Sequence, residues 1–390
     1  MAAPPKKRRW TWRSEAFRSL IYQVAALALI FAAGAYLLHN TLDNMRIRGI
    51  QSGFDFITQP AGFAIGESVI PFDSAESYGR AFLIGLSNTI RVAIAGIIFA
   101  TILGTLIGIG RLSNNFLLRS LCGAYVELIR NVPLLLQLFI WYFMLTEMLP
   151  SAEDALQPLP TVFLSKNGLQ FPVPVWDTGH GWMAAGIVAG IVAAWAWSRR
   201  CRAVRDATGV ARPVVLPGIA LVIVCAAAGW YAGGAPSVID IPERTEVTLV
   251  GGGAVTPEFL TVLLGLTVYT ASYIAEIVRA GIQSVPFGQH EASAALGLLR
   301  TQEMRLVQLP QALRVIIPPM TSQYLNLTKN SSLAVAVGYP DLISITTTSL
   351  NQTGRAIECI AIAMACYLTM SLLTAALMNV YNRVAAIRER

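Results

Sequence analysis

Charged side chains are scarce in this 390-residue sequence, and so are residues suited to catalysis. Asp, Glu, Lys and Arg make up 13% of the chain and hydrophobic residues 55%, whereas a soluble domain has roughly 25% charged residues. The three histidines, His39, His180 and His290, are too scattered for a convincing Ser/His/Asp set. A soluble globule of this size could not bury so much apolar side chain. The sequence therefore indicates a membrane protein.

The cysteine and lysine patterns exclude further kinds of site. The five cysteines are odd in number and no two form a CxxC pair, which argues against a disulfide framework and against a zinc site. None of the four lysines follows a glycine, so the GxxxxGK pattern of a P-loop is missing. The net charge of +7 comes from residues placed between apolar runs rather than on one basic face, so no nucleic-acid partner is expected. We expect no metal, no cofactor and no catalytic residue in this chain.

Eight apolar segments are long enough to cross a bilayer, which takes about 20 residues. They cover approximately residues 20–38, 81–109, 121–145, 181–198, 214–232, 259–282, 313–337 and 356–381. The first is longer than the apolar region of a cleaved signal peptide, about 7 to 15 residues, so it predicts a retained anchor. The fold class that follows is an all-α polytopic membrane protein with about eight transmembrane helices.

The basic residues predict how these spans are oriented. Lysine and arginine are enriched in cytoplasmic loops, and most of the 29 fall on one side if the chain starts inside. Basic clusters at residues 6–9, 199–212 and 383–390 dominate this count. Both termini are therefore expected in the cytoplasm.

Composition changes between residues 151 and 255, where two Ala-rich spans are joined by Pro- and Gly-rich loops. The loops at 157–174 and 233–242 predict turns and short extended pieces. We expect an N-terminal segment with its anchor and outer loop at 1–79, a core in two parts at 80–150 and 256–390, and an insertion at 151–255. Gly186 and Gly190, like Gly104 and Gly108, have the spacing of close helix contacts. Whether those contacts lie within the chain or between two copies stays open.

The segment after the sixth span predicts a short cytoplasmic helix. Pro286 and Gly288 interrupt the preceding helix, Glu291 is expected in the first turn, and Gly297 suits a left-handed helix end. Pro310 is expected to lead into the next span. On these features alone, a plain connecting loop is an equally open interpretation.

Motifs in this region and elsewhere resemble those of a known family. Glu291, Ala292, Ala295 and Gly297, followed by Pro310, resemble the EAA loop of type I ABC importer permeases, with Ser293 where that pattern has a second alanine. The stretches YVELIRNVPLLLQ at 125–137, LPQALR at 309–314 and KNSSL at 329–333 resemble the branch for polar amino acids. The insertion and the phrase GRLSNN at 110–115 resemble the Q-type permease subunit of general L-amino acid transporters.

The resemblance implies a MetI-like permease core, in the bacterial inner membrane, that moves L-amino acids from periplasm to cytoplasm by alternating access. It implies two copies of an ABC ATPase subunit that bind ATP and Mg²⁺ and dock on the EAA loop. It also implies a second homologous permease subunit, a periplasmic amino-acid-binding protein and a surround of membrane lipid. The alternative is an ion-coupled secondary transporter of small polar solutes, which should carry carboxylates near the membrane midplane.

Polar residues inside the spans are candidates for the substrate path, because they are expensive to bury in lipid. They are Asn88, Thr89 and Arg91 in the second span and Asn326, Lys329 and Ser331 in the seventh. Arg91 lies about ten residues into its span, near the midplane, and is expected to attract the carboxylate of an amino acid. The alternatives for Arg91 are an ion pair with an acid of a neighbouring helix and snorkelling to the surface.

Two Glu/Arg pairs are candidates for an inner gate. Glu127 precedes Arg130, and Glu276 precedes Arg279, by three residues, which puts each pair on one helical face. We expect ion pairs within or between helices rather than direct contact with the substrate.

Overall fold

The computed structural model describes residues 14–385 except 48, 50, 51, 69, 211, 246 and 247. The α-helices are α1 (Glu15–Ile47), α2 (Tyr78–Gly110), α3 (Phe116–Asn131), α4 (Leu134–Thr146), α5 (Thr178–Thr208), α6 (Val215–Ala232), α7 (Pro257–Gln283), α8 (Phe287–Ala295), α9 (Arg300–Glu303), α10 (Leu309–Asn330), α11 (Leu342–Thr353) and α12 (Ala356–Ala385). Shorter helical pieces are η1 (Asp55–Thr58), the π-helix η2 (Met304–Gln308) and η3 (Ser331–Val337). The basic residues 6–9 and the tail 386–390, which contribute to the predicted orientation, lie outside the described residues.

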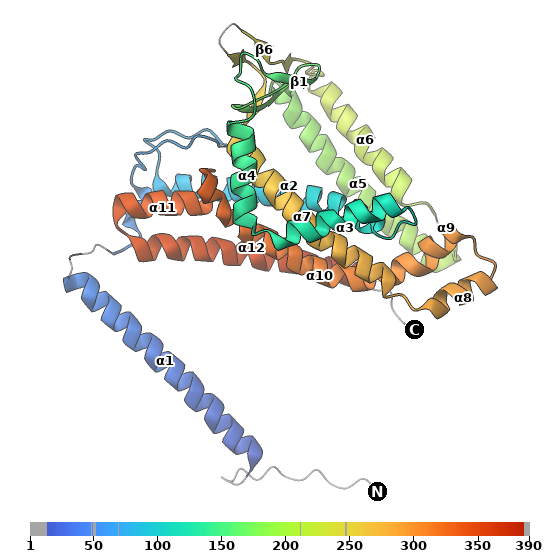
Figure 1. The fold of residues 1–390 in the computed structure, drawn as a ribbon, viewed down its shortest axis with the longest axis horizontal. Helices are drawn as coiled ribbons and strands as arrows, with labels where there is room; N and C mark the ends of the chain where they lie inside the picture. Colours follow the sequence, from blue (N-terminus) through green and yellow to red (C-terminus); the bar gives the residue numbers. More distant parts are fainter. Residues whose placement is uncertain are drawn as a thin grey trace. The chain divides into compact units, whose positions relative to one another are not determined.

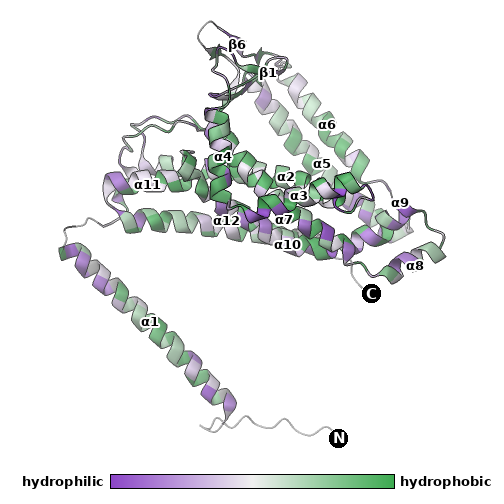
Figure 2. Ribbon diagram, in the orientation of Figure 1, coloured by the Kyte–Doolittle hydropathy of each residue, from purple (hydrophilic) through white to green (hydrophobic). Residues whose placement is uncertain are grey.

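The number of membrane spans agrees with the sequence prediction. Among the described residues, six helices are long and apolar enough to cross a bilayer: α1, α2, α5, α6, α7 and α12. Two bent pairs bring the number to eight, namely α3 with α4 at 107° and the stretch from α9 to η3 with α11 at 53°. Figure 2 shows the apolar middle and polar ends of α1. The third predicted span is thus two helices that meet at Pro133, which has no N–H to continue α3.

The chain forms two compact units, one containing residues up to Ser120 and from Tyr273 onward, the other Leu121–Ser272. In the first unit α10 and α11 pack on α12 and α2 (Figure 1). The core there joins Phe56 and Ala61 of the α1–α2 connection to residues of α2, α11 and α12, including Phe82, Leu342 and Cys359. This packing fixes the connection between α1 and α2 against the helices.

The second unit contains the insertion as a helical hairpin, α5 and α6, with short strands at one end of it (Figure 1). The strands are β1 (Leu156–Leu159), β2 (Val162–Ser165), β3 (Gly168–Phe171), β4 (Val173–Pro174), β5 (Ile239–Asp240), β6 (Glu243–Arg244), β7 (Leu249–Val250) and β8 (Gly253–Val255). They form an antiparallel sheet in the order β1-β2-β3-β8 and two ribbons, β4-β5 and β6-β7. The extended pieces predicted at 157–174 and 233–242 are therefore paired strands, which the all-α description of the spans leaves out.

Gly186 and Gly190 make their close contacts inside this hairpin. A Cβ added at Gly186 would lie 2.3 Å from the carbonyl oxygen of Cys225, and one at Gly190 would lie 2.6 Å from Cα of Val222. A Cβ added at Gly108 of α2 would likewise lie 2.8 Å from the carbonyl oxygen of Ala275 in α7. The close helix contacts predicted for Gly186, Gly190 and Gly108 are thus found within the chain, whereas the contact of Gly104 stays a prediction.

Gly186→Ala is expected to destabilise the α5–α6 hairpin by about 1–3 kcal/mol, because backbone atoms cannot move aside for the added methyl group. The measurement is the thermal unfolding midpoint of the purified protein in detergent. Gly181→Ala, in the same helix, is the control, because a Cβ there would meet no heavy atom within 4 Å. Equal midpoints for the two variants would contradict the packing described here.

Candidate functional site

The short helix predicted after the sixth span is α8. It begins directly after Pro286 and ends before Gly297, whose φ of 71° is left-handed as predicted. Glu291 is its fifth residue, so the prediction that Glu291 lies in the first turn is wrong. The helix starts earlier than expected because Pro286, with φ −60°, suits a helix start, and Gly288 is accommodated inside the first turn.

The residues of the EAA pattern lie on the exposed side of α8. Glu291, Ala292 and Ala295 are exposed, and so is Gly297 beyond the helix end. Phe287 and Leu296 add large exposed apolar side chains, 71% and 79% accessible. Ser293 alone is buried in α8, where its hydroxyl donates to the carbonyl oxygen of Gln289 at 2.6 Å. The residue that departs from the family pattern therefore lies on the inner side of the helix.

Glu303 holds α8 to the chain that follows it. One Glu303 carboxylate oxygen lies 2.5 Å from Nδ1 of His290 and accepts from Nε2 of Gln308 at 2.6 Å. Gln311 of α10 also donates to the side chain of Gln289 at 3.1 Å. The chain is already helical before Pro310, through α9 and η2, so Pro310 lies inside a continuing helix instead of starting the span.

Asn88 and Thr89 are completely buried and hold α2 to the break between η3 and α11. The side-chain amide of Asn88 donates to the carbonyl oxygens of Glu67, at 2.8 Å, and Pro340, at 2.9 Å. The hydroxyl of Thr89 donates to the carbonyl oxygen of Gly85 and accepts from the N–H of Leu342 at 3.0 Å. These two side chains are engaged in packing, so the structure offers no open surface at either of them.

Arg91 forms an ion pair with Glu67, at 2.6 Å between Nη1 and Oε1. An acidic partner was one of the alternatives for Arg91, but this acid comes from the connection between α1 and α2, not from a neighbouring helix. Glu67 is 8% exposed. The sequence did not single it out, because its partner is 24 positions away and no periodic pattern links them.

The three candidates of the seventh span divide between two faces of the chain. Ser331 is buried and its hydroxyl donates to the carbonyl oxygen of Thr328 at 2.7 Å. Asn326 and Lys329 are exposed, and the exposed Ser322, four residues before Asn326, continues the same face of α10. Among the described residues no carboxylate pairs with Lys329.

Glu276 and Arg279 form the ion pair within α7 that their spacing predicts. Glu276 also pairs with Arg111 at the end of α2, and Arg279 donates to the side chain of Gln283 at 2.6 Å. Arg111 was missed because it stands 165 positions from Glu276. Glu127 and Arg130 are both exposed on α3, and contact between them stays a prediction.

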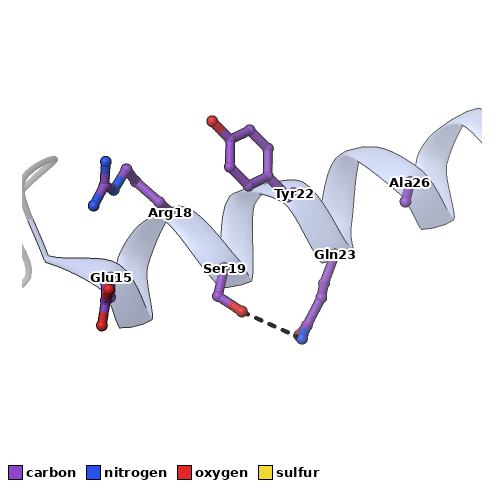
Figure 3. A pocket seen from close by; sticks show the side chains of 6 residues that line it. All are labelled: Glu15, Arg18, Ser19, Tyr22, Gln23 and Ala26. Atoms are coloured by element: carbon purple, nitrogen blue, oxygen red, sulfur yellow. Dashed lines mark hydrogen bonds between the residues drawn. The ribbon is translucent and has the colours of Figure 1, made fainter.

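The described surface of the first unit contains several hollows, two of which lie on its long helices. One, of about 380 Å³, lies between α2, α7, α10 and α12 and is mostly apolar, with Thr101 and Tyr324 joined at 2.9 Å in its wall. The other lies along α1 between Glu15 and Ala26, where Gln23 donates to Ser19 at 3.5 Å (Figure 3). All residues of the second hollow belong to one helix, so it cannot enclose a ligand.

Arg355, in the turn between α11 and α12, forms hydrogen bonds with the first part of the α1–α2 connection. Its guanidinium donates to both carboxylate oxygens of Asp55, at 2.6 and 3.0 Å, and to the carbonyl oxygen of Gly53. Glu358 accepts from the N–H of Gly53 at 2.7 Å. The hydrogen bonds from Arg355 lower the pKa of Asp55 below its ordinary value.

Comparison with known proteins identifies the family of this chain. The model of the binding-protein-dependent transport system inner membrane component matches residues 208–387. The general L-amino acid transport system permease protein AapQ of Rhizobium johnstonii is 44% identical over 385 residues, 98% of this chain and 96% of that protein. The chain belongs to this permease family.

Other relatives align with this permease over similar lengths. The putative amino-acid ABC transporter permease protein YhdX of Escherichia coli is 44% identical over 374 residues, 96% of this chain and 95% of that one. The glutamate/glutamine/aspartate/asparagine transport system permease protein BztB of Rhodobacter capsulatus is 39% identical over 406 residues, 96% and 95% of the two chains. These alignments span nearly the whole permease and so include its insertion. A crystal structure of an amino acid ABC transporter with histidines has a weak overall likeness, with a TM-score of 0.46, 20% identity and coverage of 78% and 94%.

The contact between Asp55 and Arg355 should make the permease's α1–α2 connection sensitive to acid. Because the folded pKa of Asp55 is lowered, the contact stabilises the connection above the ordinary pKa of about 3.9 and is lost as pH falls through the lowered value. Hydrogen exchange of residues 52–58 should be slower in the wild type than in Asp55→Asn at neutral pH. The difference should vanish in strong acid. A difference that stays constant down to about pH 2 would rule out this linkage.

Proposed function

We propose that this permease carries L-amino acids from the periplasm to the cytoplasm in an ATP-driven importer, by alternating access. The observation that carries the proposal is α8, a short helix that presents Glu291, Ala292 and Ala295 outward between exposed apolar residues. Such a surface fits a groove on another protein, and its sequence resembles the loop through which these permeases meet their ATPase. The amino-acid permeases AapQ and YhdX, alike over nearly their whole length, support the substrate class.

The importer would contain this permease, a second homologous permease, two ATPase subunits and a periplasmic amino-acid-binding protein. One permease chain offers one α8, whereas two ATPase subunits that close together need two docking helices. ATP and Mg²⁺ would bind to the ATPase subunits. The family description, a component of binding-protein-dependent transport, supports the binding protein as the source of substrate.

The proposed orientation puts α8 and both termini in the cytoplasm. The α1–α2 connection and the strands of the insertion then lie on the periplasmic side. The distribution of lysine and arginine supports this arrangement, since these residues favour cytoplasmic loops.

The proposed substrate path runs along the exposed polar face of α10. Ser322, Asn326 and Lys329 lie there without cover from the rest of the described chain. Polar and charged groups in a membrane face water or protein instead of lipid, which fits a path lined together with the second permease. Lys329 would attract the substrate carboxylate. Arg111, Glu276 and Arg279 would form the inner gate, where a cluster of opposite charges can separate and close again.

Glu291→Lys is expected to lower the amount of ATPase that co-purifies with the permease by at least about tenfold, as reversing one charge in a docking surface costs more than 1.4 kcal/mol. Glu153→Lys makes the same charge change at an exposed residue of the insertion and should leave co-purification unchanged. Wild-type recovery of the ATPase with Glu291→Lys, or no ATPase with the wild type after gentle extraction, would contradict the proposed docking.

Lys329→Gln should raise the KM for amino-acid uptake about tenfold, because a hydrogen bond to a charged group contributes roughly 1.5–3 kcal/mol. Lys329→Arg keeps the charge and should recover part of this loss. Uptake is measured with the complete importer in proteoliposomes. Lys166→Gln, which removes an exposed lysine from the turn between β2 and β3, is the control. An unchanged KM in Lys329→Gln would remove Lys329 from the path.

A further inference from the structure

The connection between α1 and α2 folds into a closed loop over α2. Its two ends meet where the N–H of Ala61 donates to the carbonyl oxygen of Glu76 at 2.7 Å and that of Gly62 to Ser74 at 2.9 Å. Phe63, Ile65 and Phe72 of the loop pack against the core shared by α2, α11 and α12. The described residues of this loop 59–77, all but 69, thus form a folded element that packs on these helices.

Glu67 is the residue of this loop that α2 holds most closely. Its carboxylate pairs with Arg91 at 2.6 Å, and its carbonyl oxygen accepts from the side chain of Asn88 at 2.8 Å. Asn88 and Arg91 are three residues apart, so both point from one face of α2. Side chain and main chain of a single loop residue are therefore fixed by the same helical face.

The Asn88 side chain joins this loop to the helix break. Its nitrogen donates to both Glu67 and Pro340, and because both neighbours are acceptors the amide must point its nitrogen at them. The Asn88 side-chain oxygen is then left buried with no hydrogen bond in the described part of the chain. A buried acceptor without a partner raises the free energy of the arrangement in which Asn88 holds the loop on α2. This cost makes it easier for the loop to separate from α2.

We propose that the loop 59–77 is an outer gate of the permease and that Glu67 latches it by occupying Arg91. The planar guanidinium of an arginine matches a carboxylate, and every free amino acid carries one. Glu67 and an arriving amino acid therefore compete for the same group, and the gate stays shut until Glu67 is displaced. The direction of transport and the substrate class rest on the proposed function; the latch itself rests on the contacts of Glu67.

The test uses the complete importer in lipid nanodiscs and two measurements. Glu67→Gln should raise ATP hydrolysis in the absence of the binding protein about tenfold, because an unlatched gate no longer needs the binding protein to open it. Hydrogen exchange of residues 60–75 should become faster in the same variant. Exchanging the charges, with Glu67→Arg and Arg91→Glu together, should return both measurements toward the wild type.

Glu76→Gln is the matched control. Glu76 belongs to the same loop, but its ion pair is with Arg80, at 2.7 Å, whereas the ion pair of Arg91 is with Glu67. Both measurements should match the wild type in this variant. If Glu76→Gln changed them as much as Glu67→Gln does, the effect would be a general loosening of the loop and the latch would be wrong.

Wild-type hydrolysis and exchange in Glu67→Gln would overturn the proposal. Should that variant fail to assemble, Glu67→Asp, which withdraws the carboxylate by one methylene, takes its place with the same criteria. Failure of the proposed function has a different signature, namely no amino-acid uptake by the wild-type importer. The exchange measurement needs neither substrate nor ATP, so it still decides whether Glu67 holds the loop.

Discussion

Two adjacent side chains of α2, Asn88 and Thr89, hold the point at which the helical backbone is broken. Between η3 and α11 the chain turns at Gly338, with φ 80°, and the carbonyl oxygen of Pro340 accepts a hydrogen bond from a side chain, that of Asn88. Non-helical backbone at membrane depth is tolerated only where protein or water satisfies it. Asn88 donates to Pro340, and Thr89 accepts from the first turn of α11. The bend of this span, and the place of α11 on α2, depend on these bonds.

Three charged residues of the helices, Arg91, Glu276 and Lys329, have three different kinds of surroundings. Arg91 is paired with a loop carboxylate, Glu276 is shared by Arg111 and Arg279, and Lys329 lies on an exposed face of α10. A paired charge can remain in a low-dielectric site, whereas loss of one partner leaves the other charge buried at a large cost. Pairs that can exchange partners therefore suit gates, and an exposed lysine suits a contact made with something outside this chain.

Local signals made the spans and α8 predictable. Long apolar runs identify helices in a membrane without knowledge of their neighbours, and Pro286 and Gly297 mark the limits of α8 by their own backbone preferences. The same reasoning could not show that the hydroxyls of Thr89 and Ser331 form hydrogen bonds with backbone groups. A polar residue in an apolar run gives the same sequence pattern whether its side chain faces a substrate path or a neighbouring carbonyl oxygen. Glu67, Arg111 and Glu303 were missed since their partners are set by tertiary packing. Predicting them would need the contact between distant segments first.

One helix connects the proposed docking surface with the proposed outer gate. The α8 segment is tied through Gln289 to Gln311 near the start of α10 and through Glu303 to the turn before it. From there α10 runs for 22 residues, about 33 Å at 1.5 Å per residue, and passes through η3 into the break that Asn88 holds. The same Asn88 amide also donates a hydrogen bond to the loop that contains Glu67. A displacement of α8 could move α10 along its axis. Because a helix is stiffer than the side-chain hydrogen bonds at its end, the bonds of Asn88 and Thr89 at the break would be strained first. The Asn88 side-chain oxygen, which has no hydrogen bond in the described part of the chain, lies at the same place, so a partner gained there on movement would offset a bond that is lost.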